Sequence, residues 1–256
     1  MSSSVMEQAV LSLRLYADLV ASSVARLHVL ANPMVKLVFL RQIYFTAVRS
    51  LRLLSIVALV IGAAFVGNMT QILGADPRVF DLVELVLVGN TAPMAAAVII
   101  IGRSATAISS ELALMRCTGE IESLRNLRIP VHDYLIVPRV AAVTLATVGC
   151  CFYFQLIAVV GGFALSALML DVSLEEQLRR FAEHVTVGDM VLQVLKSLCF
   201  GFAIAAIACG TGLNIAPRMA EVPLAPARVF LRGLLVVMAI NALFLVATWT
   251  GARYTV

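Results

Sequence analysis

Five long apolar runs constrain the fold of this chain more than any other feature. Their central parts contain essentially no Asp, Glu, His, Lys or Arg, and they cover residues 53–73, 82–101, 140–170, 197–216 and 233–251. A helix needs about 20 largely apolar residues to cross a bilayer. Inside hydrocarbon the helix also has the advantage that it satisfies its own backbone hydrogen bonds. We therefore expect an all-α, polytopic membrane protein with about five transmembrane helices.

The overall composition supports this expectation. The chain is 61% hydrophobic and 13% charged, and its mean hydropathy is +0.99. In soluble proteins about a quarter of the residues are charged. The basic residues are scattered and are not interleaved with aromatic residues, so no nucleic-acid partner is expected. The five cysteines show no CxxC spacing, and no metal site is predicted.

We predict a single domain over residues 1–256. Residues 1–50 mix apolar residues with basic ones and are expected to form amphipathic helices in the cytoplasm or the membrane interface, ahead of the transmembrane helices of residues 51–256. Pro33 suits the first turn of a helix, because it has no N–H and its φ is fixed. Pro93 lies inside the second apolar run and predicts a kink or a broken turn there.

A charged segment, residues 109–128, separates the second and third runs, and its charges exclude it from hydrocarbon. Its sequence, SSELALMRCTGEIESLRNLR, alternates apolar and charged positions at helical spacing. Gly119 near its middle predicts a break into two short helices. We interpret residues 104–128 as a helix at the membrane surface that contacts a water-soluble partner. The alternative is an ordinary solvated helix.

The positions of Arg and Lys predict the orientation. With the N-terminus inside, 14 basic residues are cytoplasmic and 5 are external. The positive-inside rule then places the N-terminus and residues 104–128 in the cytoplasm and the C-terminus outside. The external loop over residues 171–196 is acidic and long enough for a short helix.

Several kinds of chemistry are missing from the chain. It contains no GxxxxGK[ST], HExxH or GxSxG motif. Proton- or ion-coupled transporters usually hold ionisable groups inside the membrane, and the central parts of the five runs show none. These features favour a non-catalytic translocation subunit that is driven by another chain and moves an apolar substrate, with lipid as the natural candidate. The alternative is an ATP-independent channel or secondary transporter for a small apolar solute.

Three stretches resemble the MlaE (YrbE) permease family, whose ABC transporters move phospholipids between bacterial membranes. In residues 90–140 the matching elements are Pro93, Gly102-Arg103, Glu111-Leu112, Met115-Arg116, Glu120-Ile121, Leu124 and Pro138-Arg139. Residues 195–214 match at Lys196-Ser197, Phe200-Gly201 and Gly212-Leu213. Before the first span the matches are Arg41-Gln42, Tyr44-Phe45 and Val48-Arg49-Ser50. The sequence departs from the family pattern at two places. Gly89 and Asn90 stand where the family often has Arg-Glu, and residues 217–225 replace the family's GAEGVG loop.

The resemblance implies a permease subunit of the bacterial inner membrane that helps to maintain the lipid asymmetry of the outer membrane. Its implied partners are a second permease copy, a cytoplasmic ABC ATPase, a periplasmic MCE-domain hexamer, often a STAS-domain protein, and phospholipid. ATP and Mg would be bound by the ATPase, and no cofactor is expected in this chain. The implied ATPase-coupling residues are Glu111, Met115, Arg116, Glu120, Glu122 and Leu124. The implied lipid-binding residues, at the end of the first span and the start of the second, are Met69, Gln71, Leu73, Asn90, Pro93 and Met94; the alternative for them is ordinary helix packing.

Overall fold

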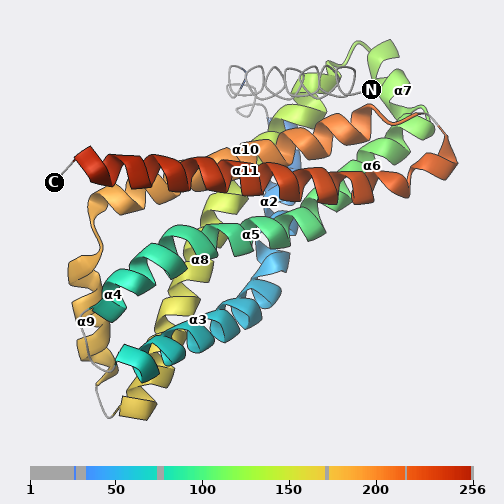
Figure 1. Ribbon diagram of the computed structural model, residues 1–256. Helices are drawn as coiled ribbons and strands as arrows, with labels where there is room; N and C mark the ends of the chain where they lie inside the picture. The colour runs from blue at the N-terminus through green and yellow to red at the C-terminus, as the bar shows by residue number, and fades with distance from the viewer. Residues whose placement is uncertain (1–25, 27–32, 74–77, 171–172, 217, 255–256) are drawn as a thin grey trace.

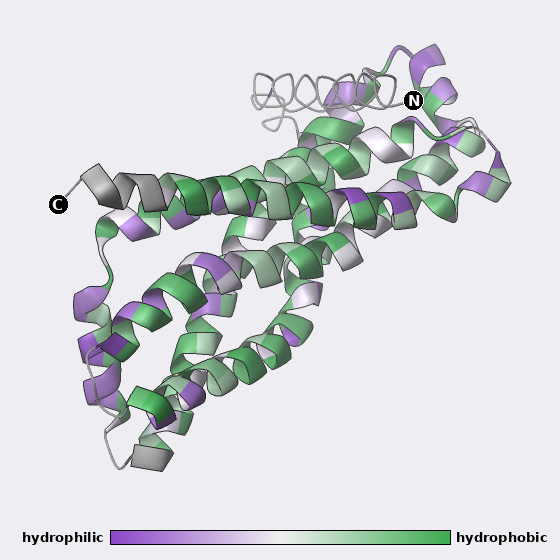
Figure 2. Ribbon diagram, in the orientation of Figure 1, coloured by the Kyte–Doolittle hydropathy of each residue, from purple (hydrophilic) through white to green (hydrophobic). Residues whose placement is uncertain are grey.

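The computed structural model describes residues 26, 33–73, 78–170, 173–216 and 218–254. Within these residues every element of secondary structure is a helix, as Figure 1 shows, which confirms the all-α class. Five helical stretches are long and apolar enough to cross a membrane: Val35–Leu73, Arg78–Cys117, His132–Leu168, Val187–Leu213 and Met219–Thr248. Their middle parts are mainly hydrophobic, and hydrophilic residues gather toward the ends of the bundle (Figure 2). The five predicted apolar runs are thus confirmed as five candidate spans.

Each candidate span is built from one or more consecutive helical elements. The first is α2 (Pro33–Thr46), η2 (Val48–Ser50) and α3 (Leu51–Leu73). The second is α4 (Arg78–Leu82), η3 (Val83–Thr91), α5 (Ala92–Ile100), η4 (Ile101–Ala105) and α6 (Thr106–Cys117), and it is followed by α7 (Glu120–Asn126). The rest of the chain forms η5 (His132–Ile136), α8 (Val137–Leu170), α9 (Leu174–His184), α10 (Val187–Leu213), η6 (Met219–Glu221) and α11 (Leu224–Tyr254).

The first span is longer than its apolar run. Pro33 begins α2, as its fixed φ predicts, and the chain continues through η2 into α3. Apart from Arg26, the predicted interfacial segment before residue 33 lies outside the described residues. The part that is described, α2, packs against α8.

Helix α8 is the centre of the bundle. It contacts α2, α3, α5 and α10, and its Phe154 and Phe163 are fully buried. A helix that packs on several sides is expected to be apolar around its whole circumference. This explains why residues 140–170 contain no Asp, Glu, His, Lys or Arg. The helix runs without interruption to Leu170.

Glycines allow the helices to cross closely. A Cβ placed on Gly62 of α3 would collide with the backbone of Ala158 in α8. A Cβ on Gly201 of α10 would lie 2.6 Å from the Cα of Thr144, also in α8. Small residues at such crossings let backbones approach, and this close packing is a main source of helix association in membranes. The absence of a Cβ at Gly62 therefore permits the close contact between α3 and α8.

Helix α9 is the short helix expected between the third and fourth spans. Its N-terminus is capped by Ser173, whose Oγ accepts a hydrogen bond from the Glu176 N–H at 3.3 Å. Phe181 is buried against Phe163 of α8, with ring centroids 5.7 Å apart. The helix thereby packs against one end of the bundle, which we call the α9 end; the opposite end, where α7 lies, is the α7 end (Figure 1).

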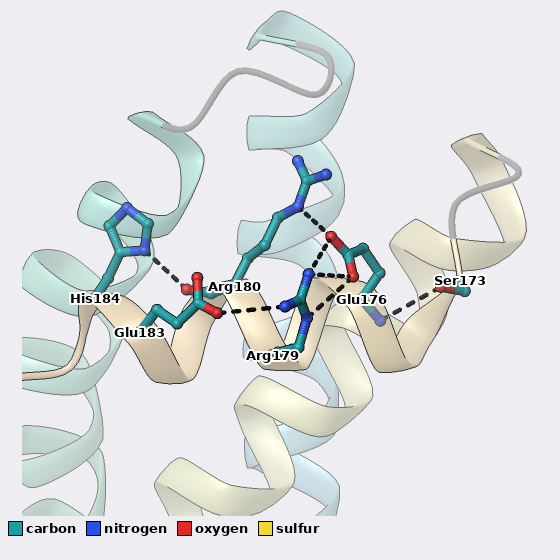
Figure 3. A network of polar contacts seen from close by, with 6 residues as sticks. All are labelled: Ser173, Glu176, Arg179, Arg180, Glu183 and His184. Atoms are coloured by element: carbon teal, nitrogen blue, oxygen red, sulfur yellow. Dashed lines mark hydrogen bonds and ion pairs between the residues drawn. The ribbon is translucent and has the colours of Figure 1, made fainter.

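A carboxylate organises the outer face of α9 (Figure 3). Glu176 accepts hydrogen bonds from Arg180 at 2.8 Å and from Arg179 at 2.9 Å, and Arg179 also approaches Glu183 at 3.6 Å. The hydrogen bond from Arg180, followed by that from Arg179, holds the pKa of Glu176 below the ordinary glutamate value of 4.5. A carboxylate with a lowered pKa stabilises the fold above its unfolded pKa and loses this contribution as the pH falls through its folded pKa.

We expect Glu176→Gln to speed hydrogen exchange of the α9 backbone amides at neutral pH. The difference from the wild type should disappear at a pH well below 4.5, where the wild-type carboxyl is also protonated. Glu175→Gln is the matched control, since Glu175 is the exposed neighbour outside this network. Mass spectrometry of exchanged peptides, with variants compared at the same pH, measures the effect. Equal exchange of the Glu176→Gln variant and the wild type at neutral pH would contradict the role of this network.

Candidate functional site

Two regions carry the predicted functional residues, and the first is the helix pair α6 and α7 at the α7 end. Helix α6 ends at Cys117, and Gly119 adopts a left-handed conformation with φ of 78° before α7 begins at Glu120. Glycine adopts this conformation without strain because it has no Cβ. The predicted break at Gly119 is therefore confirmed.

Apolar side chains hold this pair against the bundle while its acidic side chains face outward. Leu112 and Ile121 are buried. Among the predicted coupling residues, Met115 and Leu124 are half-buried against the core, Arg116 is half-buried, and Glu111, Glu120 and Glu122 are exposed. We call the exposed side chains of Glu111, Glu120 and Glu122 the acidic surface.

A hollow of about 470 Å³ adjoins the acidic surface. It lies where α7, the start of the third span and the end of α10 meet, and its polar lining includes Arg116, Glu122, Arg125, His132 and Asn214. Two predicted coupling residues, Arg116 and Glu122, thus share one hollow. A depression with charges of both signs at the end of a bundle suits the insertion of a polar protein segment.

Glu111 also has a structural partner that the sequence did not reveal. Its Oε1 lies 2.9 Å from Nη2 of Arg139, whose side chain is only 6% exposed. Within the described part of the chain, the Nε and Nη1 atoms of Arg139 have no hydrogen-bond partner. Removing the partner of a buried charge is strongly destabilising. A charge reversal at Glu111 would therefore disturb this pair as well as any contact with a partner. Glu120 and Glu122 are better positions for testing coupling, because neither pairs with Arg139.

The second region begins at the helix break before Pro93. The stretch η3 is π-helical, and α5 starts at Ala92 with Pro93 in its first turn, so the predicted irregularity is confirmed. Pro93 has no N–H to donate to the carbonyl of Gly89, four residues earlier. That carbonyl instead accepts a hydrogen bond from Nζ of Lys196 at 2.9 Å, and Lys196 also donates to Oδ1 of Asn90 at 3.0 Å.

Lys196 lines a cavity of about 280 Å³ between η3, α10 and α11, which we call the polar cavity. Three acidic residues, Asp81, Glu84 and Asp189, line it together with Lys196. Apolar residues complete the lining, among them Leu85, Val88, Leu192, Phe244 and Leu245. The cavity therefore offers one cation, several carboxyl groups and an apolar wall within a short distance.

The structure separates the predicted lipid-binding residues into two groups. Asn90 lines the polar cavity. With Met94 it also lines an apolar groove of about 450 Å³ beside α3. The other residues of this groove are Val57, Thr91, Ala95, Val98 and Ile99. Pro93 is buried within the bundle. Met69 and Leu73 are half-buried near the end of α3, and Gln71 is exposed there, so these three residues do not join Asn90 and Met94 in the groove.

Lys196 and its acidic neighbours correct one expectation from the sequence. The candidate spans were expected to hold essentially no central ionisable group, and Lys196 was assigned to the external loop before residue 197. Helix α10 instead begins at Val187, and Lys196 is 5% exposed inside it. The sequence offered two signals for this contact. Lys196 directly precedes an apolar run, and Pro93 leaves a carbonyl without its helical donor.

These features define a multi-pass membrane protein with an acidic surface at one end and a polar cavity within the bundle. The chain belongs to the MlaE permease family, because the model of that family, Permease MlaE, matches residues 39–247. A similar protein is a probable ABC transporter permease protein of Synechocystis sp., 28% identical over 204 residues, which are 78% of each chain. Another, of Rickettsia prowazekii, is 26% identical over 194 residues, 75% of each chain. The chloroplastic protein TRIGALACTOSYLDIACYLGLYCEROL 1 of Arabidopsis thaliana is 28% identical over 183 residues, which are 68% of this chain and 51% of its own.

Proposed function

We propose that this chain is the transmembrane subunit of an ATP-driven ABC transporter that moves phospholipids between the inner and outer membranes of a bacterium and so maintains outer-membrane lipid asymmetry. The observation that carries the proposal is the acidic surface, which a buried Leu112 and Ile121 fix at the end of a bundle of the MlaE permease family. Relatives named as probable ABC transporter permease proteins support the transporter class. The Arabidopsis relative, whose name is that of a glycolipid, supports a lipid substrate.

The proposed location is the inner membrane, with the α7 end in the cytoplasm and the C-terminus in the periplasm, as the distribution of basic residues favours. A cytoplasmic ABC ATPase would bind the acidic surface and supply ATP and Mg. A second permease copy would complete the dimer, and a periplasmic MCE-domain hexamer would meet the α9 end. A STAS-domain protein is a further proposed partner of the ATPase.

The polar cavity suits the headgroup of a phospholipid. The ammonium group of Lys196 can attract a phosphate, while the carboxylates of Glu84 and Asp189 can attract the ammonium of a zwitterionic headgroup. The apolar groove that Asn90 and Met94 line would accept acyl chains, and Asn90 belongs to both spaces. This arrangement keeps Asn90 and Met94 as proposed lipid-binding residues and adds Lys196, while the buried Pro93 acts only by breaking the helix beside them.

Coupling requires that the ATPase bind one conformation of the permease better than another, since a partner shifts an equilibrium only by its differential affinity. Helix α6, which carries Glu111, is placed to transmit such a bias. It continues from α5 through η4, and α5 carries most of the residues of the apolar groove. Movement of α6 would then reach the groove along one continuous stretch of helix, whereas α7 follows only after the break at Gly119.

Affinity purification from the native membrane in mild detergent tests the assembly. We expect an ATP-binding protein, an MCE-domain protein and phospholipid to elute with this chain, and mass spectrometry identifies each. Elution of the chain alone, under conditions that keep other membrane complexes intact, would favour the ATP-independent channel or secondary transporter instead.

A charge reversal tests the acidic surface. We expect Glu122→Lys to reduce the retained ATPase about tenfold, which corresponds to about 1.4 kcal/mol, because it removes a charge from the hollow that Arg116 and Arg125 share. Glu175→Lys makes the same change on exposed α9, at the other end of the bundle, and should leave ATPase retention unchanged. Normal ATPase retention and lipid transport by the Glu122→Lys variant would remove Glu122 from the coupling assignment.

A further inference from the structure

An exposed stripe on α2 combines arginines with aromatic and aliphatic side chains. Arg41 and Arg49 both approach the ring of Phe45, with their Cζ atoms 5.6 and 5.1 Å from its centroid. Tyr44 meets the same ring edge-on, at 5.9 Å and 81°. On α2 the exposed positions recur at intervals of three and four and therefore share one helix face: Leu37, Leu40, Arg41, Tyr44 and Phe45. The exposed Val48 and Arg49 of η2 and Arg52 at the start of α3 follow this face along the chain. We call these exposed residues together the α2 stripe.

The positive charges of the α2 stripe are not neutralised by the described residues. Residues 33–73 contain no Asp or Glu, and no ion pair joins Arg41 or Arg49 to a carboxylate in the part of the chain that the structure describes. On α9, in contrast, Arg179 and Arg180 share the carboxylate of Glu176. Cation–π contacts fix the guanidinium groups over a ring but leave their N–H edges available for an anion.

The depth of the stripe follows from the length of the first apolar run. Residues 53–73 form about 31 Å of helix, which matches the hydrocarbon thickness of a bilayer. Arg49 and Arg52 therefore lie at the edge of the hydrocarbon, and α2 continues beyond it. The chain changes direction between α2 and α3 (Figure 1), and the opposite face of α2 packs on α8. The stripe thus faces the headgroup layer at the α7 end.

We propose that the α2 stripe binds the headgroups of anionic phospholipids in the leaflet at the α7 end, with a phosphate held by Arg41 and Arg49. Tyr44 and Phe45 would lie between the headgroups and the glycerol backbone, where aromatic rings are favoured. A second copy of the chain fits this face poorly, because two-fold symmetry would bring two unneutralised arginine pairs together. This site lies away from the polar cavity, and it requires only that the chain spans a membrane.

Lipid retention by the purified full-length chain tests the proposal. The chain is exchanged into equal amounts of phosphatidylglycerol and phosphatidylcholine, and the lipids that remain bound are counted by native mass spectrometry. We expect the wild type to retain phosphatidylglycerol preferentially, and Arg41→Gln/Arg49→Gln to lower that preference about tenfold. Arg179→Gln/Arg180→Gln removes the same charge from a neutralised pair and should leave the preference unchanged.

Further measurements distinguish a lipid headgroup from free phosphate as the bound anion, and one of them does not depend on the folding of the double variant. If free phosphate were the ligand, millimolar inorganic phosphate would abolish the preference, and this outcome would overturn the lipid assignment. Added salt should weaken wild-type retention of phosphatidylglycerol but not of phosphatidylcholine, which tests the proposal even if the double variant does not fold. Equal retention of both lipids by the wild type would overturn the proposal. The proposal would also be overturned if the double variant lost a co-purifying protein but kept the lipid preference, because the α2 stripe would then be a protein interface.

Discussion

Replacing Gly62 with alanine is expected to prevent α3 and α8 from packing and to abolish most of the folded protein. The added Cβ would collide with the backbone of Ala158, which cannot rotate away as a side chain can. Overpacking of a core typically costs about 1–3 kcal/mol, and a clash with backbone belongs at the upper end of that range. Because the contact between α3 and α8 is the most extensive between helices in the described part of the chain, the damage should reach the whole bundle.

Gly149→Ala is the matched control for this prediction. Gly149 also lies in a long helix, but a Cβ there meets no atom within 4 Å. Alanine is favoured over glycine in helices by up to about 1 kcal/mol, so this variant should equal or exceed the wild type in stability. Detergent-induced unfolding and yield after gel filtration measure both variants. A Gly62→Ala variant as stable as Gly149→Ala would show that the two helices do not cross as closely as the structure has them.

The architecture could be predicted because it depends on local composition. Hydrocarbon demands long uncharged helices, and this requirement identifies the spans before any contact is known. The breaks at Gly119 and Pro93 were predictable for the same reason, since a glycine and a proline act on their own backbone. The ends of the spans were less predictable. The charged residues of α2 do not stop the helix, because α2 packs on α8 beyond the apolar run.

The contacts of the candidate site depend on tertiary structure. Lys196 meets Gly89, and Arg139 meets Glu111, across helices that are distant in sequence. The family resemblance predicts which segments line a lipid site, and this remains a prediction; it does not tell which side of each helix faces a cavity. Asn90 of η3 and Met94 of α5 therefore share a groove. Met69, Gln71 and Leu73 belong to the same predicted group but lie outside this groove, near the end of α3.

The second large effect is expected at Lys196, where methionine should destabilise the junction of η3 and α10. The substitution removes the hydrogen bonds that Lys196 donates to the carbonyl of Gly89 and to Oδ1 of Asn90, and it removes the cation that lines the polar cavity with Glu84 and Asp189. Hydrogen bonds to charged groups contribute about 1.5–3 kcal/mol each, so we expect a loss of about 3 kcal/mol or more. Lys196→Arg retains the charge and should lose less. Detergent-induced unfolding measures both, and lipid transport should fall in the same order.

Pro93→Ala provides an internal test of the reason for this effect. Alanine restores a backbone N–H at position 93, which can donate to the Gly89 carbonyl in an α-helix. Lys196→Met should therefore cost less in the Pro93→Ala background than in the wild type, and a double-mutant cycle isolates the difference. If Lys196 acts only as a charge in the polar cavity, the two costs will be equal. If Lys196→Met lowers the stability less in the Pro93→Ala background, and transport is still absent, the two roles are separate. The hydrogen bond to Gly89 then stabilises the helix break, and the ammonium group binds the lipid headgroup.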